Sequence, residues 1–294
     1  MADPAALAVG QQLLIPGWDG NPGPLPIAPL LNDAQGKAEG KLQPVKFSIR
    51  EDNVFAQWVQ ADREETVGVL YQKGIYRRGN EKPEDFIRQA SGLLRRAKLS
   101  DGEMNAIAAI AQNEGNLDAV NTWDGQYLSF GLFQWTAGSP DRPGELGALL
   151  TRLKQSYPDE FQHYFGQFGL DVEASDGVRG WLSLGGVRLS NDYQKNLLRQ
   201  AIWAYRFAIA GRDLAVKAVE ILHAIDRVDR FYFVRHSGLG GYSLADLIQS
   251  EFGLALLLDN HVNRPAYVAP GIAEALAQLK LQPVVLANGT TKPS

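Results

Sequence analysis

Residues 111–135, AQNEGNLDAVNTWDGQYLSFGLFQW, place one glutamate at the end of an apolar run, followed by a segment rich in aromatic residues, amides and glycines. Residues 101–114 repeat apolar side chains at the three- and four-residue spacing of a helix, and Glu114 continues that apolar stripe. Gly115 follows at once, where a helix commonly ends in a left-handed residue. The sequence therefore predicts a carboxylate at the C-terminal end of a helix, pointing toward the core.

Glu114 has the chemistry of a proton donor in that position. Desolvation and the negative end of the helix dipole both disfavour the charged form of a carboxyl group. A carboxylic acid that keeps its proton near neutral pH is what general acid catalysis needs. A surface glutamate at a frayed helix end is the alternative for this residue taken alone, and the residues downstream favour the catalytic interpretation.

The downstream segment predicts a hairpin. Asp124 and Gly125 form a strong turn signal, and the strand-like run YLSFGLFQW follows with Gly131 at its centre. A glycine inside a strand often marks the close approach of a ligand or of another backbone. Asp124 is a candidate second carboxylate at the mouth of this hairpin.

The same segment offers groups that could bind a sugar polymer. Flat apolar faces for sugar rings could come from Trp123, Tyr127 and Trp135. Hydroxyl and amide partners could come from Ser129, Gln134 and Thr136. Plain packing in the core is the alternative for each aromatic residue.

This combination resembles the lysozyme-like superfamily, in which a catalytic glutamate ends a helix and a small β-hairpin lines the cleft. The SFGLFQW string is similar to a segment of goose-type lysozymes and soluble lytic transglycosylases, whereas the spacing from Glu114 to Asp124 is closer to phage-type lysozymes and chitosanases. The resemblance implies a mainly α, lysozyme-like helical domain with a small β-hairpin flanking the cleft.

The resemblance also implies roles for individual residues. Glu114 would protonate the leaving glycosidic oxygen, and Asp124 would position water or stabilise the oxocarbenium-like transition state. Ser129, Gly131 and Gln134 would contact substrate. Because a late helix end often borders the cleft in such folds, Asn263 and Arg264 are further binding candidates.

The resemblance implies a muramidase that cleaves the glycan strands of peptidoglycan. Glu114 is followed by Gly115, whereas goose-type enzymes and transglycosylases usually have a serine there, so a lytic transglycosylase and a chitosanase-like glycosidase stay open. A non-catalytic wall-binding component of a phage tail or contractile injection particle is a further alternative, and proteins of such a particle are candidate partners.

Composition limits the remaining chemistry. The chain of 294 residues contains no cysteine, and its four histidines show no metal-ligand spacing, so we expect neither a metal nor a cofactor. A net charge of −4 gives no global reason to expect nucleic acid as a partner. No apolar run is long enough to insert into a membrane and no signal peptide is apparent, so we expect cytoplasmic synthesis followed by delivery to the cell wall by a particle or secretion system.

The predicted organisation has three parts. Residues 1–50 combine a fragment similar to a LysM module at 7–17 with a linker rich in proline and glycine, residues 51–285 form the catalytic domain, and residues 286–294 are a tail. Helices are predicted at 52–62, 83–96, 99–113, 145–156, 191–210, 213–228, 243–260 and 271–279. The predicted β-structure is confined to 124–135 and a short hairpin at 181–189.

Overall fold

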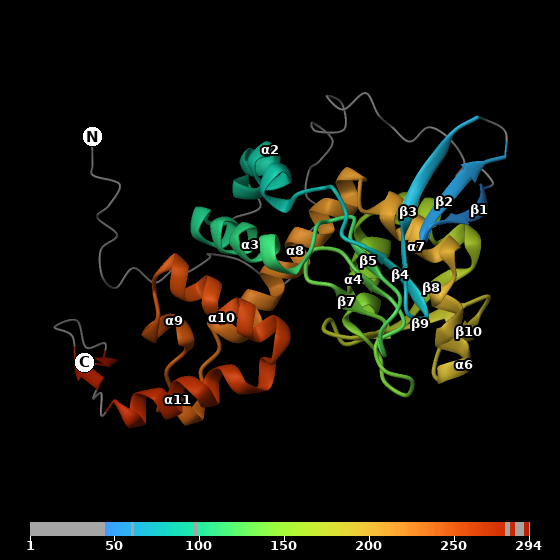
Figure 1. Ribbon diagram of the computed structural model, residues 1–294. Coiled ribbons are helices and arrows are strands. Elements are labelled where there is room, and N and C mark those ends of the chain that lie inside the picture. Colours follow the sequence, from blue (N-terminus) through green and yellow to red (C-terminus); the bar gives the residue numbers. More distant parts are fainter. Residues whose placement is uncertain (1–44, 60–61, 97–98, 280–282, 286–290, 294) are drawn as a thin grey trace. The chain divides into compact units, whose positions relative to one another are not determined.

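The computed structural model describes residues 45–59, 62–96, 99–279, 283–285 and 291–293 (Figure 1). The side chains of 93, 96, 112–114, 174 and 283–293 are outside this description. The described residues fall into two compact units, of which the larger unit ends at Asp226 and the C-terminal unit begins at Arg227. The LysM-like fragment, the linker up to residue 44 and most of the tail lie outside the described residues, so the predicted three-part organisation stays a prediction.

The larger unit is built on a seven-stranded antiparallel sheet in which the strands follow one another in sequence order (Figure 1). The strands are β1 (Val45–Arg50), β2 (Asn53–Trp58), β3 (Glu64–Tyr71), β4 (Gly74–Arg77), β5 (Val120–Asn121), β6 (Ser129–Phe130) and β7 (Trp135–Thr136). The predicted mainly α, lysozyme-like fold with one small hairpin is therefore wrong, because four strands precede the hairpin segment and join it in one sheet.

The reason for this error lies in residues 52–62, which were predicted as a helix. Val54 and Trp58 satisfy the spacing of a helix, but Val54 and Ala56 also satisfy the two-residue spacing of a strand. The structure buries both Val54 and Ala56 on one face of β2, with exposed fractions of 1 % and 0 %. Pairing with β1 and β3 along the whole strand decides in favour of the sheet.

A second, three-stranded sheet lies later in the larger unit. It contains β8 (Leu170–Ser175), β9 (Gly180–Leu184) and β10 (Val187–Arg188). The predicted hairpin at 181–189 is confirmed by the pairing of β9 with β10 through a turn at Gly185 and Gly186. Both glycines have positive φ, at 60° and 79°, which a tight hairpin turn requires.

Helices cover this framework. The larger unit contains α2 (Pro83–Arg96), α3 (Asp101–Glu114), α4 (Glu145–Ser156), α5 (Pro158–Tyr164), η1 (Gly166–Phe168), α6 (Asp192–Lys195), η2 (Asn196–Arg199), α7 (Ala201–Ala210) and the first part of α8 (Leu214–Tyr232). The predicted helices at 83–96, 99–113, 145–156 and 213–228 are confirmed. The helix predicted at 191–210 is broken, because Gln200 has an extended backbone with ψ of 143°.

The C-terminal unit contains the end of α8 and short helices. These are η3 (Ser237–Leu239), α9 (Leu244–Leu247), α10 (Glu251–Asn263), η4 (Pro265–Tyr267) and α11 (Val268–Gln278), with strands β11 (Pro283–Val285) and β12 (Thr291–Pro293). The helix predicted at 243–260 is split at Ile248, which is extended, and Ser250 caps the helix that follows. In the described part of the chain, no helix combines the length and apolar character needed to cross a membrane.

Candidate active site

Helix α3 carries Glu114 as its last residue. Ser100 caps its N-terminus in a reciprocal capping box with Glu103. Met104, Ile107 and Ala111 are buried with exposed fractions of at most 3 %, so the apolar stripe predicted from the sequence faces the core. The side chain of Glu114 lies outside the described part of the structure, so its burial and its role stay predictions.

Gly115 brings the end of α3 against the hairpin segment. Its backbone is extended, with φ of 178°, so the left-handed conformation expected for this glycine is wrong. A Cβ on Gly115 would lie 3.2 Å from the carbonyl oxygen of Gly131 and 3.3 Å from Nε2 of Gln134. The glycine at this position thus allows the helix end and the turn at 131–134 to touch.

The turn at residues 131–134, which we call the site turn, joins β6 to β7. Gly131 has a left-handed backbone with φ of 76°, and its carbonyl oxygen accepts hydrogen bonds from the backbone N–H of Gln134 at 3.0 Å and from Nε2 of Gln134 at 2.9 Å. The N–H of Gly131 donates to the carbonyl of Ala119 at 2.9 Å. Two predicted substrate-binding residues, Gly131 and Gln134, are therefore side by side and bonded to each other.

Asp124 lies in the loop between β5 and β6. Its Oδ1 accepts a hydrogen bond from the N–H of Gln126 at 2.8 Å, and its Oδ2 accepts one from Nδ2 of Asn121 at 3.1 Å. Arg199 donates to the carbonyl oxygens of Thr122 and Asp124, the latter at 2.6 Å. Asp124 is half-buried, and both of its carboxylate oxygens already have local partners.

Two of the predicted aromatic faces belong to the core. Trp135 has an exposed fraction of 1 % and packs edge-on against His223 with ring centroids 5.4 Å apart. Tyr127 is 3 % exposed and donates its hydroxyl hydrogen to Oδ1 of Asp192 at 2.6 Å. Burial, together with the charge of Asp192, raises the pKa of Tyr127 to about 12.

Trp123 is in a different environment. It is half-buried and meets Tyr71 of β3 edge-on, with ring centroids 4.9 Å apart. Tyr71 has an exposed fraction of 49 %. Among the aromatic residues predicted to bind sugar, Trp123 is therefore the one that reaches an exposed part of the sheet.

The register of the sheet places further polar residues in one row. Tyr76 pairs with Asn121, Asn121 with Ser129, and Ser129 with Thr136. Side chains of residues directly opposite one another lie on the same face of an antiparallel sheet. Ser129 is buried, Thr136 is half-buried and Tyr76 is exposed, so two predicted binding residues continue into a row that begins at an exposed tyrosine.

Asn263 and Arg264, the remaining predicted binding residues, belong to the C-terminal unit. Asn263 is the last residue of α10, and its Nδ2 donates to the carbonyl of Asp259 at 3.1 Å. Arg264 follows the helix, and its N–H donates to the carbonyl of Asn260 at 2.6 Å. Both therefore take part in ending the helix.

Glu220 of α8 is a buried carboxyl group at the site turn. Its exposed fraction is 0 %, its Oε2 accepts a hydrogen bond from the N–H of Leu132 at 2.9 Å, and its Oε1 has no hydrogen-bond partner among the described residues. Burial, and then the negative charge of Asp118, raise the pKa of Glu220 well above its ordinary value of 4.5, against the hydrogen bond from Leu132 and the charge of Lys217. The signal in the sequence is an acid flanked by apolar residues in AVEIL, 218–222, which sequence analysis did not single out.

Asp118 is a second buried carboxyl group, just before β5. Its Oδ1 accepts hydrogen bonds from the N–H groups of Asn80 at 2.6 Å and Glu81 at 2.8 Å, and its Oδ2 accepts one from Arg77 at 2.8 Å. Burial alone would raise the pKa of Asp118, but these donors and the charge of Arg77 outweigh it and hold the pKa below 3.8. This group is a carboxylate at neutral pH.

Residues 192–199, which we call the clamp segment, hold the loops on both sides of the hairpin. Asp192 accepts from the hydroxyl of Tyr127, and Arg199 lies over the Tyr127 ring at 4.8 Å from its centroid. Lys195 is 1 % exposed and donates to the carbonyls of Ala137, Ser139 and Arg142. Burial lowers the pKa of Lys195 to about 8. The clamp segment thus contacts loop 122–127 and loop 137–142.

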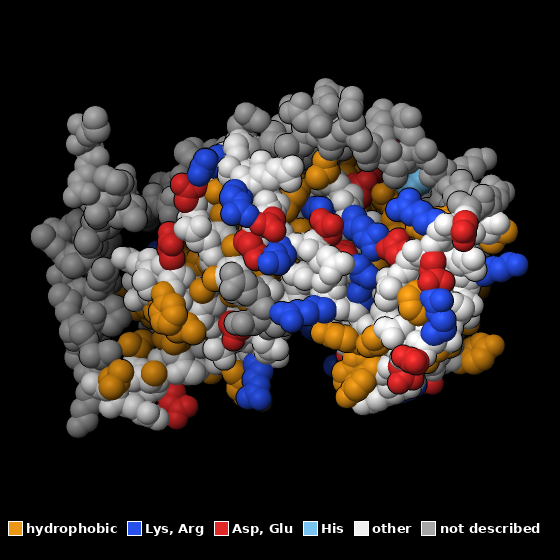
Figure 2. Space-filling view, turned by 45° about the horizontal axis from the view of Figure 1, so that its top comes forward, with side chains coloured by type: hydrophobic (Ala, Val, Ile, Leu, Met, Phe, Trp, Pro, Cys, Tyr) orange, Lys and Arg blue, Asp and Glu red, His pale blue; other side chains and the backbone are white. Residues whose placement is uncertain are grey.

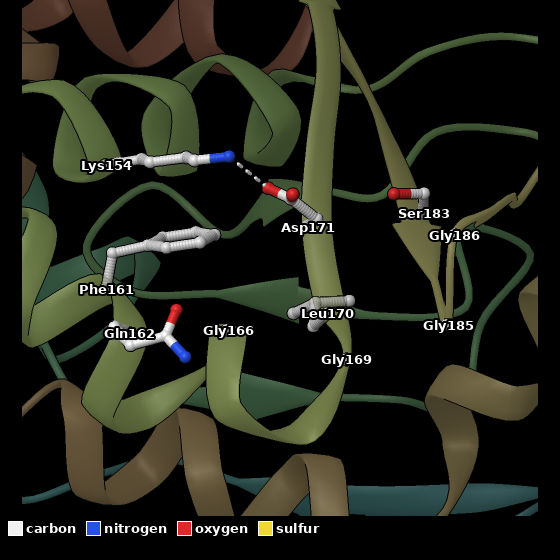
Figure 3. A pocket seen from close by; sticks show the side chains of 10 residues that line it. All are labelled: Lys154, Phe161, Gln162, Gly166, Gly169, Leu170, Asp171, Ser183, Gly185 and Gly186. Atoms are coloured by element: carbon white, nitrogen blue, oxygen red, sulfur yellow. Dashed lines mark hydrogen bonds and ion pairs between the residues drawn. The ribbon is translucent and has the colours of Figure 1, made fainter.

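A separate pocket lies between α4, α5 and the β8–β9 sheet (Figure 3). Its volume is about 270 Å³, and Lys154 and Asp171 form an ion pair of 2.6 Å at its edge. Figure 3 shows Lys154 extending above the ring of Phe161 toward Asp171. None of the residues predicted to bind glycan lines this pocket.

The charged side chains of the described residues form neither a metal-binding group nor a patch of one sign on the face drawn in Figure 2. Among the described residues, no group of three or more His, Cys, Asp or Glu side chains is placed to hold a metal ion. On the face drawn in Figure 2, basic and acidic side chains of the described residues are interspersed. Comparison with family models, with curated proteins and with solved structures found no match to this chain.

Proposed function

We propose that the chain is a glycoside hydrolase that cleaves the glycan strands of peptidoglycan, with Glu114 as the general acid. The proposal rests on one observation, which is that α3 ends at Glu114 directly against the site turn, through the contact of Gly115 with Gly131 and Gln134. A helix end that meets a hairpin brings an acidic residue next to a segment rich in hydrogen-bonding groups. This is the arrangement that general acid cleavage of a glycosidic bond needs.

In the proposed reaction, Glu114 gives its proton to the glycosidic oxygen as the bond from that oxygen to the anomeric carbon breaks. Water attacks the anomeric carbon and loses a proton to Asp124, or to Glu114 in its ionised form. Support for the role of Asp124 comes from its fixed loop, which Arg199 holds through two backbone carbonyls.

The hydrogen bonds of Asp124 favour a second candidate, a lytic transglycosylase. Both carboxylate oxygens of Asp124 accept hydrogen bonds from neighbouring residues, so they are less available to bind water. A transglycosylase needs only the acid, because a hydroxyl group of the substrate itself attacks the anomeric carbon. Mass spectrometry of digested peptidoglycan separates the two, since reducing ends indicate hydrolysis and anhydro-sugar ends indicate transglycosylation.

The test of the proposal is Glu114→Gln, compared with Asp101→Asn at the exposed start of the same helix. General acid catalysis typically contributes about 10²–10⁴ in rate, so we expect Glu114→Gln to slow the release of glycan fragments at least ~10²-fold. Asp101→Asn should leave the rate unchanged. Equal activity of Glu114→Gln and the wild type on purified peptidoglycan would rule out the proposed function. Cleavage of soluble chitosan without cleavage of peptidoglycan would show that the substrate is chitosan and not peptidoglycan.

A further inference from the structure

We infer that Glu220 is a positioning residue, whose buried carboxyl group holds the site turn against the C-terminal end of α3. The inference rests on the proposed function, because it concerns the assembly of the same site. Glu220 has no exposed surface, so it cannot touch a substrate itself. It acts through the backbone of Gly131 and Leu132.

The contact between Glu220 and the site turn is a close one. The N–H of Leu132 donates to Oε2 of Glu220 across 88 positions of sequence, at 2.9 Å. A Cβ on Gly131 would overlap that same carboxyl oxygen, so the backbone passes as near to Glu220 as a chain can. Gly131 in turn presents its carbonyl oxygen to Gly115 at the end of α3. Glu220, the site turn and the helix end therefore form one contiguous stack.

The surroundings of Glu220 require a neutral carboxyl group. It receives one hydrogen bond, and its second oxygen has no partner although it is completely buried. A buried carboxylate with so few donors is strongly disfavoured, whereas a protonated carboxyl group still accepts the hydrogen bond from Leu132. Burial and the neighbouring charge of Asp118 raise the pKa of Glu220 accordingly.

The titratable groups near Glu220 come from several elements. From α8 itself, Lys217 lowers the pKa of Glu220, but Lys217 also donates to Oε2 of Glu81. His223 is one turn further along α8 and packs against Trp135. From the segment before β5, Asp118 contributes a negative charge.

These surroundings predict a site that is assembled only while Glu220 is protonated. Ionisation at high pH would place a charge beside Asp118 with a single donor to stabilise it, and release of the site turn would relieve that cost. The end of α3 would then lose the surface that it contacts. Protection of the site turn from hydrogen exchange should therefore fall as the pH rises through the pKa of Glu220.

The sign of the effect on stability follows from proton binding. At a pH above 4.5, the ordinary pKa of a glutamate side chain, the unfolded chain has lost the Glu220 proton, while the folded chain keeps it. The stabilising contribution of Glu220 is therefore complete below pH 4.5, and it is lost as the pH rises to the pKa that Glu220 has in the folded protein. Across that window the unfolding equilibrium constant should rise about tenfold per pH unit from this group.

The experiment compares the wild type with Glu220→Gln and a control, Glu84→Gln in the first turn of α2. Glutamine keeps a carbonyl oxygen for Leu132 N–H but cannot ionise. Denaturant unfolding at a series of pH values should show that Glu220→Gln loses the pH-dependent change that the wild type and Glu84→Gln share.

A measurement on the wild type needs no variant. Hydrogen exchange of the N–H groups of Leu132 and Gln134 should lose protection as the pH rises, relative to N–H groups of β2 corrected for intrinsic exchange. Unchanged protection of the site turn, or the same pH dependence of unfolding in Glu220→Gln and the wild type, would overturn the inference. The expected release of the site turn without any glycan cleavage would overturn the proposed function alone.

Discussion

Asp118 and Glu220 are two carboxyl groups of the larger unit with exposed fractions of 0 %, and their surroundings differ in the number of donors. Asp118 accepts hydrogen bonds from two backbone N–H groups and from Arg77, and Arg212 lies 3.8 Å away. Glu220 accepts one, from Leu132. Burial acts on both groups in the same direction, so the donors decide which of them is charged.

The number of donors around a buried carboxyl group therefore decides whether that group keeps its proton in this protein. The pKa of Asp118 is lowered and the pKa of Glu220 is raised, although each side chain is fully buried. Groups whose pKa values are pushed apart in this way are frequent at functional sites. The charge of Asp118 is also one cause of the raised pKa of Glu220, so the two groups are coupled.

The largest effect is expected from neutralising the group that needs its charge. Asp118→Asn would leave Arg77, whose side chain is only 9 % exposed, without its counterion. Loss of one partner of a buried ion pair typically costs about 3–5 kcal/mol of unfolding free energy. Glu220→Gln should cost far less at neutral pH, because it replaces a neutral group by a neutral one. Equal losses in denaturant unfolding at pH 7 would show that the two carboxyl groups do not differ in charge.

Asp118 and Glu220 should also differ in how they make the free energy of unfolding depend on pH. The stabilising contribution of Asp118 is complete above pH 3.8, the ordinary pKa of an aspartate side chain, and it is lost as the pH falls through the lowered pKa of Asp118. The pH dependence expected for Glu220 is the opposite. Asp118→Asn should therefore remove part of the acid sensitivity of the wild type.

A smaller effect is expected at Lys195, a buried cation that resembles Asp118 in being fully satisfied by hydrogen bonds. Lys195→Met would leave three backbone carbonyls without their donor, at a cost of about 1–3 kcal/mol if one of them stays buried and unpaired. Lys154→Met is the matched control, because Lys154 is 44 % exposed and surface ion pairs contribute about 0–1 kcal/mol. A smaller loss for Lys195→Met than for Lys154→Met in thermal unfolding would contradict this interpretation.

An effect of similar size is expected where the site turn meets Glu220. Gly131→Ala adds a Cβ at a left-handed position, at about 1–2 kcal/mol, and also forces Glu220 away from Leu132. Gly125→Ala is the control, because nothing lies within 4 Å of a Cβ at that position. Equal unfolding free energies for the two variants would mean that the site turn can adjust without Glu220.

The helices were predictable because their signals are local. Ser100 and Glu103 form a capping box at the start of α3, and Ser243 and Asp246 form one at the start of α9. The strands before the hairpin were not predictable from the same signals. Phe55 and Val59 fit the spacing of a helix, and only pairing with the flanking strands β1 and β3 shows that residues 53–58 belong to a sheet.

The candidate site was predictable in part for the same reason. Glu114 at a helix end is a local feature, and the structure has it, whereas Gly131 was predicted inside a strand and lies in the turn between β6 and β7. The contact of Glu220 with Leu132 links positions 88 apart, and no local pattern indicates such a partner. The burial of Trp135 was equally hidden, because an aromatic residue in a hairpin serves a binding surface or a core with the same sequence signal.

The clamp segment has a consequence for motion. Loops 122–127 and 137–142 are held by three side chains of one short stretch, Asp192, Lys195 and Arg199. Opening of that stretch would free both loops together, so they belong to one cooperative unit of local unfolding. The two loops therefore share one opening equilibrium. A change that weakens the contacts of either loop with residues 192–199 lowers the free energy of local unfolding for both loops.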